Sequence, residues 1–239
     1  MTSVSATSTV PRLTIAALTG LPPLVTWPVT FGFSLRAMFC SLSSSRARVT
    51  DTLESTWPRA LAERPNVPAS GANVSDAAVQ AEVVKGFTGG ALTFNSSTLY
   101  AVFSGPGVNL GGGFGTQYCA YHGHFTWNGN DVKYAVMPYN ATYPSACTDG
   151  TGISPTSDFA AAAEVNTLAH ETEETMTDED LNAWYDNRGY ENADKCAWNF
   201  GTTHSGATGT YNQTMGGVNW MIQMNWLNAN SGGCVQHWP

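Results

Sequence analysis

The stretch YCAYHGHFTWNGNDVKYAVMPYN, residues 118–140, decides the fold because two alternating segments flank Asn128-Gly129. Asn-Gly is the strongest short signal for a hairpin, since both residues accept the positive φ angles of a tight β-turn. We therefore predict a β-hairpin in which residues of about 117–127 pair with residues 131–138. Alternation along the first strand places its aromatic residues on one face and His122 and His124 on the other. Two such histidines can bind a metal ion, although a solvated or hydrogen-bonded pair is the more common arrangement.

Two helices and two further strands are predicted around this hairpin. A helix of about residues 76–85 begins at Ser75 or Asp76 and ends at Gly86. A strand follows at residues 99–103, and alternation over residues 217–227 predicts a late strand. The longest helix, residues 158–175, is capped by Ser157 or Asp158 and has an apolar stripe along one face. This helix carries the residues on which the functional prediction depends.

The end of the long helix reads H-E-T-E-E, residues 170–174. His170 and Glu174 lie one turn apart on one face, with Glu171 beside the histidine. The pattern H-E-x-x-E differs from the zincin motif H-E-x-x-H by a glutamate in the second ligand position, and glutamate oxygen is also a zinc ligand. A helix C-terminus disfavours exposed carboxylates by about 0.3–1 kcal/mol each, and a bound cation would offset that repulsion. The alternative is a solvated acidic helix whose glutamates repel only weakly in salt.

Further candidate residues follow the helix. Thr177 is predicted to cap a second helix whose first turn is acidic. A third metal ligand is expected from Glu191 or Asp194, which follow a glycine turn. Glu171 is the candidate general base, and Tyr185 is a candidate to stabilise an oxyanion. Zinc is the expected divalent metal, although so anionic a site also suits manganese or calcium, and a contribution from His122 or His124 would favour zinc.

Composition limits the classes of partner. The chain has 239 residues, is 42% hydrophobic and carries a net charge of −8, so it can form a substantial core and has no basic surface for nucleic acid or an anionic membrane. The charge is uneven: residues 1–70 have six arginines against three carboxylates, whereas the remainder has four cations against fifteen. We therefore predict a poorly ordered or divergent N-terminal extension over residues 1–70 and an α+β domain over residues 71–239. Residues 13–25 resemble a weak secretory leader and are too short and too rich in proline to span a membrane.

Cysteines and glycosylation sequons indicate a secretory route. The four cysteines beyond residue 70 allow three pairings, of which we favour Cys119 with Cys147 and Cys196 with Cys234, leaving Cys40 unpaired. The alternative is free buried thiols. Four N-x-S/T sequons occur, at Asn73, Asn95, Asn140 and Asn212. An extracellular location is expected.

Several of these motifs recur in one known family. From residue 118 to residue 239, the chain resembles the phosphate-induced protein 1 family, whose plant members are the EXORDIUM proteins. The resemblance rests on YCAYHGHF, VKYAVMPY, VNTLAHETEETMTDEDLNAWYD and ENADKC, and on the closing strand with its late cysteine. It implies a secreted or wall-associated protein with a zincin-like core whose metal-binding and catalytic positions are His170, Glu171, Glu174, Glu191 and Asp194. Residues 1–70 depart from the family, which begins with a clear signal peptide and an aromatic first strand.

Two hypotheses follow. The first is a secreted α+β protein with a zincin-like mixed sheet, an active-site-type helix, disulfides and an irregular N-terminal extension, which acts as a peptidase-like metallohydrolase. The second is a non-catalytic extracellular protein of the EXORDIUM type that binds a cell-wall polymer through exposed tryptophans such as Trp127, Trp184, Trp198 and Trp226. A metal ion with a purely structural role is a variant of the first. Neither hypothesis involves nucleic acid or an integral membrane segment, and the sequence indicates no oligomeric state.

Overall fold

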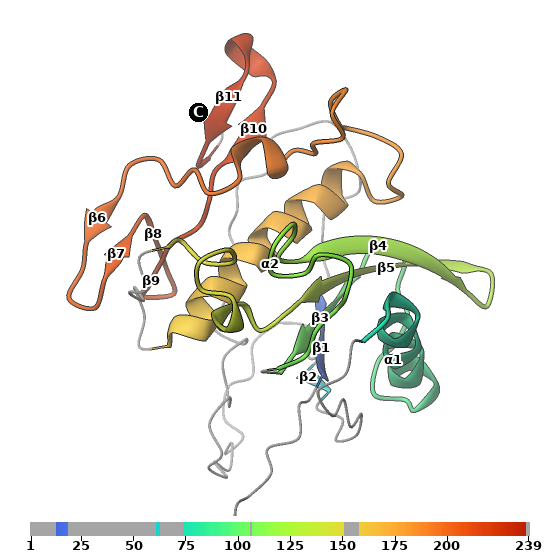
Figure 1. Cartoon of the computed structure of the whole chain (residues 1–239). Coiled ribbons are helices and arrows are strands. Elements are labelled where there is room, and N and C mark those ends of the chain that lie inside the picture. Colours follow the sequence, from blue (N-terminus) through green and yellow to red (C-terminus); the bar gives the residue numbers. More distant parts are fainter. Residues whose placement is uncertain (1–12, 19–60, 63–73, 106, 151–157, 238–239) are drawn as a thin grey trace, which may run out of the picture.

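A computed structural model of the chain describes residues 13–18, 61–62, 74–105, 107–150 and 158–237. Within these residues the architecture is mixed α+β, with one five-stranded sheet, two α-helices and a C-terminal region of short strand pairs (Figure 1). This confirms the predicted fold class at the level of α+β. Neither helix in the described part of the chain combines the length and the hydrophobicity needed to cross a bilayer.

The sheet contains both parallel and antiparallel pairs. Its strands are β1 (Leu13–Leu18), β2 (Leu61–Ala62), β3 (Leu99–Ser104), β4 (Tyr121–Trp127) and β5 (Asn130–Met137), in the order β2-β1-β3-β5-β4. β3 and β5 are parallel, and the other pairs are antiparallel. The predicted hairpin is confirmed, with Asn128 and Gly129 at φ angles of 50° and 76°. β4 is therefore an edge strand of a mixed sheet.

Each face of the sheet packs against one helix. Because side chains alternate along a strand, Tyr100 and Val102 of β3 join the cluster that contains Val79 and Val83 of α1 (Asp76–Thr88). On the opposite face, Leu99 and Ala101 of β3 and Ala135 and Met137 of β5 pack with Leu168 of α2 (Phe159–Thr177). The sheet thus separates two apolar layers, and the odd-numbered residues of β3 face α2.

Both helices begin at the predicted caps. Ser75 caps α1, accepting a hydrogen bond from the backbone N–H of Ala78, and Asp158 caps α2 in the same way from Ala161. The predicted end of α1 at Gly86 is wrong, because the helix continues to Thr88. Gly86 lies inside it where Leu92 packs closely, and a Cβ there would come within 2.4 Å of Leu92 Cδ1.

The second helix predicted after Thr177 does not form. Thr177 is the last residue of α2, and its hydroxyl donates back to the carbonyl of Glu173. Asp178 instead accepts hydrogen bonds from the backbone N–H groups of Asn182 and Ala183, which holds the chain in a turn. The acidic residues after Thr177 therefore belong to a loop that leads from α2 to Glu191.

The predicted late strand at residues 217–227 is divided into two short strands. β9 (Val218–Trp220) pairs with β8 (Gln213–Met215), whereas β10 (Asn225–Leu227) pairs with β11 (Gly233–Val235). Between them, side-chain oxygens of Asn212 and Asn166 accept the backbone N–H groups of Ile222 and Gln223. The alternating pattern is real, but asparagine side chains replace the partner strand. The remaining pair is β6 (His204–Ser205) with β7 (Thr210–Tyr211).

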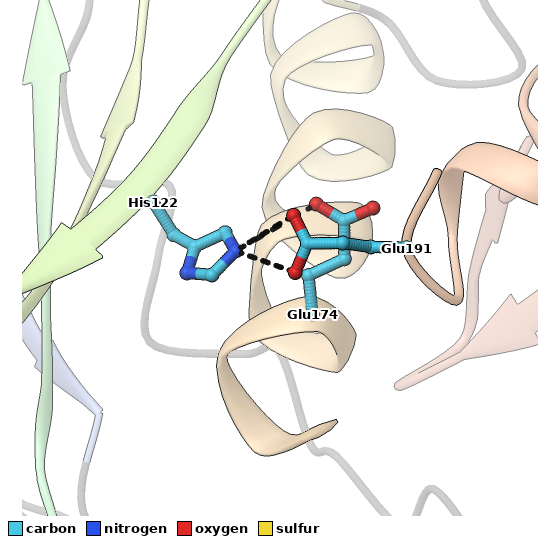
Figure 2. Close-up of side chains that lie close together, drawn as sticks. All are labelled: His122, Glu174 and Glu191. Atoms are coloured by element: carbon cyan, nitrogen blue, oxygen red, sulfur yellow. Dashed lines mark hydrogen bonds and ion pairs between the residues drawn. The ribbon is translucent and has the colours of Figure 1, made fainter. Parts of the chain in front are cut away.

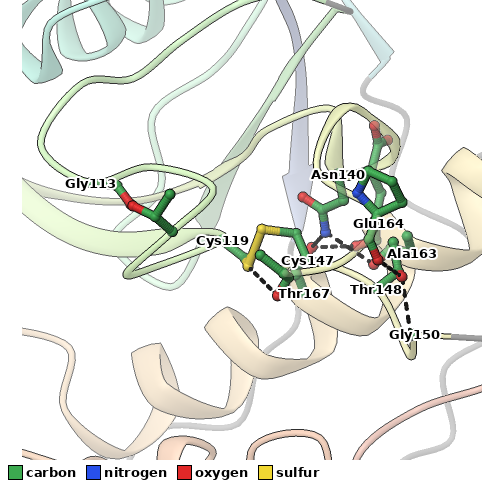
Figure 3. The surroundings of a disulfide bond; sticks show 12 residues. Gly113, Cys119, Asn140, Cys147, Thr148, Gly150, Ala163, Glu164 and Thr167 are labelled. Atoms are coloured by element: carbon green, nitrogen blue, oxygen red, sulfur yellow. Dashed lines mark hydrogen bonds between the residues drawn. A yellow bond between two sulfur atoms is a disulfide. The ribbon is translucent and has the colours of Figure 1, made fainter.

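Both predicted disulfides are present, Cys119–Cys147 and Cys196–Cys234. The first lies next to the short 3₁₀ helix Asn140–Thr142 and the start of α2 (Figure 3). The second ties the 3₁₀ helix Asp194–Cys196 to β11. Another 3₁₀ turn spans Ala229–Ser231. Cys40 lies outside the described residues.

The sequons differ in whether they could carry a glycan. Asn140 is completely buried, and its amide nitrogen donates to the carbonyl of Ala163 and the hydroxyl of Thr167 (Figure 3). A glycan on that nitrogen does not fit the folded chain, so Asn140 is a structural residue and the predicted modification there is wrong. The amide nitrogen of Asn212 is likewise bound by backbone carbonyls. Asn95 is exposed, and Asn73 lies outside the described residues.

Part of the predicted N-terminal extension contributes to the sheet. β1 lies between β2 and β3, and all six of its residues pair with β3. Leu13–Leu18 opens the stretch for which a leader was considered, and residues 19–25 of that stretch lie outside the described residues. The sheet therefore includes segments on both sides of the predicted boundary at residue 70.

Candidate metal centre

Five potential metal ligands converge from three parts of the chain. His170 and Glu174 come from the last turns of α2, His122 from the edge strand β4, and Glu191 and Asp194 from the segment that follows the loop after α2. Figure 2 shows His122 pointing from its strand toward the carboxylates of Glu174 and Glu191. Of the two acids that were predicted as alternatives, Asp194 lies within ligand distance of His170 and Glu174, whereas Glu191 lies with Glu174 and His122.

The helix places its own pair by its periodicity. Glu174 Oε1 lies 3.0 Å from Nε2 of His170, one turn earlier. Glu174 is 4% exposed, because α2 is covered by the sheet on one side and by the C-terminal region on the other. A buried carboxylate in this position needs positive partners, and the imidazole of His170 supplies one.

His122 reaches the cluster because of strand alternation. It lies on the face of β4 that looks toward α2, opposite the face on which Tyr121 and Phe125 pack. Its Nε2 lies 3.2 Å from Glu191 Oε1 and 4.0 Å from Glu174 Oε2. From the sequence alone, His122 is only a conditional ligand. The alternation of side chains along β4 places His122 on the face opposite the aromatic residues, and this pattern in the sequence indicated the face on which it lies.

The segment with the downstream acids is held against the helix by hydrogen bonds. The backbone N–H of Asp194 donates to Glu174 Oε1 over 3.1 Å, and the backbone N–H of Glu191 donates to Asp194 Oδ2 over 3.3 Å. Asp194 Oδ1 lies 3.5 Å from Nε2 of His170. Gln223 donates to the carbonyl of Ala193 from the other side, and the Cys196–Cys234 disulfide follows. Glu191 and Asp194 are therefore fixed in position by neighbours on both sides.

The ligand atoms form two groups that share Glu174. One contains His122, Glu174 and Glu191, and the other contains His170, Glu174 and Asp194; in each group all ligand atoms lie within 4.8 Å of one another. With metal–ligand bonds of about 2.0–2.1 Å, two ligands of a tetrahedral zinc ion lie about 3.3 Å apart. The His122–Glu191, His170–Glu174 and His170–Asp194 distances of 3.2, 3.0 and 3.5 Å match that spacing. The separation of Nε2 of His122 and Glu174 Oε2 is longer, 4.0 Å, so the first group could hold a divalent ion only after these two side chains move closer together.

The cluster carries more negative than positive charge. Four carboxylates, from Glu171, Glu174, Glu191 and Asp194, lie with two imidazoles, so negative charges exceed positive ones even when both histidines are protonated. The Lys and Arg residues of the described segments interact elsewhere. Lys85 pairs with Glu82, Lys133 with Asp131 and Asp180, and Arg188 with Asp186, while Lys195 lies over the ring of Trp226. A cation from solution is the remaining source of positive charge.

The pKa values of the histidines and of Glu171 are shifted by the excess of carboxylates in the cluster and by burial. Burial lowers the pKa of His122, but its hydrogen bond to Glu191 and the nearby carboxylate charges outweigh burial and raise the pKa overall. For His170, burial is similarly outweighed by Asp194 and Glu174, and the pKa lies well above its ordinary value. Burial raises the pKa of Glu171 to about 8, with Glu174 adding to the shift and the two imidazoles opposing it. One oxygen of Glu171 is buried without a hydrogen-bond partner.

A second acidic cluster, which includes the other histidine of β4, already contains a cationic side chain. His124, Asp131 and Asp180 have ligand atoms close enough for a cation, but the ammonium group of Lys133 binds both aspartates directly. His124 is exposed, whereas His122 is buried. The two histidines of β4 thus have different environments, and His124 offers a matched control for His122.

Tyr185 lies apart from these contacts. It is 55% exposed, in the loop between α2 and Glu191, near the exposed Trp184 and Tyr190 in the sequence. Its assignment as an oxyanion-stabilising residue stays a prediction. Trp184 and Leu181 of this loop adopt positive φ angles of 50° and 56°, which keeps the loop from continuing α2.

Comparison of the chain with models of known protein families, with curated proteins and with solved structures finds no match. The resemblance to the phosphate-induced protein 1 family therefore rests on the quoted motifs alone.

The Cys196–Cys234 disulfide is expected to support metal binding as well as stability. Replacing both cysteines by alanine should lower the free energy of unfolding by about 2–4 kcal/mol. It should also weaken zinc binding by about 10- to 100-fold, because mutating residues that hold metal ligands in place usually changes metal affinity by that factor. The matched control is the Cys119–Cys147 pair, which closes a loop of similar length, 28 against 38 residues. Equal losses of zinc affinity in the two double variants, measured by calorimetric titration, would contradict this role.

Glu164 is expected to make stability depend on pH. Burial, aided by the charge of Asp158, raises its pKa to about 8 from an ordinary 4.5. The folded chain then keeps a proton that the unfolded chain loses above about pH 4.5, so stability present at low pH is lost as the pH rises toward 8. With chelator present, Glu164→Gln should match the wild type near pH 4.5 and exceed it by a few kcal/mol at pH 8.5, since each pKa unit corresponds to about 1.4 kcal/mol. Parallel pH profiles in urea denaturation would refute this assignment.

Proposed function

We propose that this protein is a secreted, metal-dependent hydrolase whose centre lies between the end of α2, strand β4 and the segment that contains Glu191 and Asp194. The single observation that carries the proposal is the convergence of two imidazoles and at least three carboxylates at ligand spacing in a partly buried site. The excess negative charge of this site supports a cation as its partner. Zinc suits the two histidines, and the zincin-like arrangement of helix and sheet is part of the proposal.

Each side chain has a role in this proposal. The helix motif supplies His170 and Glu174 as metal ligands, and Asp194 completes their set. Glu191 contributes to the second set, together with His122 and Glu174. A bound divalent ion supplies Lewis acidity, which activates water near neutral pH and polarises a carbonyl group. Glu171 is the general base, because one of its oxygens is buried and accepts no hydrogen bond from the chain. Its pKa of about 8 would fall when a cation lies nearby, which would leave it ready to accept a proton.

Peptide or amide hydrolysis is the reaction class that we propose. The exposed aromatic residues Trp184, Tyr185 and Tyr190 lie in the loop that connects the two halves of the site, and they suit contacts with an extended polymer. The disulfides are consistent with an extracellular location, and a cell-wall peptide is a substrate class that fits both features. The EXORDIUM-like resemblance points to the same location.

The test is hydrolysis of a fluorogenic peptide library by the zinc-loaded chain. Cleavage should disappear with 1,10-phenanthroline and return with added zinc. Absence of cleavage in a preparation that retains stoichiometric zinc would contradict the enzymatic role and would favour a structural metal.

A non-catalytic binding function is favoured by one specific observation. Trp184 and Trp198 are 53% and 40% exposed, which leaves their rings accessible to a polymer. Trp127 and Trp226, which were also candidates, instead pack against Phe87 and Lys195. If the protein binds a cell-wall polymer, Trp184→Ala and Trp198→Ala should weaken retention on insoluble wall polysaccharide, and chelators should have no effect.

A further inference from the structure

The two ligand groups of the cluster have the same composition. Each contains one histidine, one carboxylate of its own and a share of Glu174: His122 with Glu191, and His170 with Asp194. The two oxygens of Glu174 are divided between them, since Oε2 lies 4.0 Å from Nε2 of His122 and Oε1 lies 3.0 Å from Nε2 of His170. A carboxylate that presents one oxygen to each of two similar groups has the geometry of a bridging ligand.

We propose that the cluster holds two divalent metal ions bridged by the carboxylate of Glu174. One ion is bound by His122, Glu191 and Glu174 Oε2, and the other by His170, Asp194 and Glu174 Oε1. This inference rests on the proposed function, because it assumes that the cluster binds metal at all. It goes further by fixing the number of ions and by assigning each histidine to a different one.

A single ion does not account for the arrangement. Two ligands of one zinc ion lie at most about 4.2 Å apart, which is twice the bond length. Among the residues that the structure describes, no group of mutually close ligand atoms contains both His122 and His170. One ion would therefore leave one histidine and its carboxylate without a metal partner, although these side chains are already arranged as ligands.

The charges of the site also favour two ions. The three ligand carboxylates, from Glu174, Glu191 and Asp194, carry three negative charges, whereas one divalent ion carries two positive charges. With neutral imidazoles, a single ion would leave a negative charge uncompensated beside Glu174, which is 4% exposed. Uncompensated buried charge is costly, and the Lys and Arg side chains of the described segments are engaged elsewhere.

A pair of ions has a clear chemical use. In two-metal sites, ions about 3.5–4 Å apart stabilise the attacking and the leaving oxygen of one displacement. Each group here supplies one nitrogen and two oxygen donors, so each ion keeps positions for water and substrate. Manganese and cobalt suit this mixed donor set as well as zinc does, which allows spectroscopic tests.

The experiment is metal stoichiometry of the full chain. The dialysed protein is titrated with Zn²⁺ in a calorimeter, and the metal retained after desalting is measured by elemental analysis. Two ions per wild-type chain are expected, falling to one in His122→Ala and to one in His170→Ala, while the control His124→Ala keeps two. If a histidine variant does not fold by circular dichroism, Glu191→Gln and Asp194→Asn replace it with the same expectation.

The outcomes separate the two proposals. One ion in the wild type, lost in His170→Ala and kept in His122→Ala, overturns the two-ion assignment and leaves the metal-dependent function standing. No retained ion overturns both. If both histidine variants still bind two ions, the ions lie elsewhere in the chain, and the assignment is also overturned. With Mn²⁺, the bridged pair should give an exchange-coupled multiline electron paramagnetic resonance spectrum, whereas two isolated ions would give uncoupled six-line signals and contradict the bridge.

Discussion

Zinc affinity is expected to fall by more than about 100-fold when Glu174 is replaced by glutamine, since even residues that only support metal ligands change affinity by 10- to 100-fold. Glu174 contacts the imidazoles of both His170 and His122 and accepts the backbone N–H of Asp194. The substitution keeps the shape of the side chain but removes the negative charge that both ligand groups share. Calorimetric titration with Zn²⁺ measures the effect.

The control for this variant is the preceding residue. Glu173 is also largely buried, and burial raises its pKa to about 7, but its carboxylate accepts a hydrogen bond from Asn192 and contacts neither histidine. Glu173→Gln should therefore bind zinc nearly as the wild type does. If the two variants lose affinity equally, the acidity of the helix end rather than the ligand role of Glu174 explains binding.

Replacing Glu171 by glutamine is expected to lower the rate of peptide hydrolysis by about 10²- to 10⁴-fold, the usual contribution of general acid–base catalysis, while zinc remains bound. Glu171 is buried next to His170 and interacts electrostatically with His122 and Glu174. Glutamine fills the same space and cannot accept the proton. Turnover of a cleaved library peptide and zinc content, measured on the same preparation, separate catalysis from metal binding.

Glu164→Gln is the matched control for the base. Glu164 lies on the same helix, is 4% exposed and has a pKa raised by burial to about the same value, but its charged neighbour is Asp158 rather than the histidines. This variant should hydrolyse peptide at the wild-type rate. A comparable loss of rate in Glu164→Gln would show that replacing a buried glutamate of α2 lowers activity by disturbing the fold. Glu171 would then no longer be assigned as the base.

The sequence predicted those parts of the fold whose signals are local. The hairpin at Asn128-Gly129, both helix caps and the strand at residues 99–103 depend on short patterns, and the structure confirms them. The two disulfides were predictable because four cysteines allow only three pairings, and the structure has the favoured one. The errors arose where packing and side-chain contacts decide the backbone. α1 continues through Gly86, which packs closely on Leu92, and the side chains of Asn212 and Asn166 bind the backbone of the predicted late strand between β9 and β10.

The candidate site shows the same division. The spacing of His170 and Glu174 on one helix determines their contact, so the sequence alone predicted it. The sequence left Glu191 and Asp194 as alternatives, because nothing local says which acid faces which histidine. The structure assigns Asp194 to His170 and Glu191 to His122. His122 is 48 residues away from His170 in the chain, and only the packing of α2 across β4 and β5 brings the two together.

The most direct test of a divalent metal at this cluster is anomalous X-ray diffraction from crystals of the full chain grown with Zn²⁺, recorded above and below the zinc absorption edge. An anomalous peak is expected at bonding distance, about 2.0–2.2 Å, from Nε2 of His170 and an oxygen of Glu174. Zinc-saturated crystals with no anomalous peak beside Glu174 would contradict it.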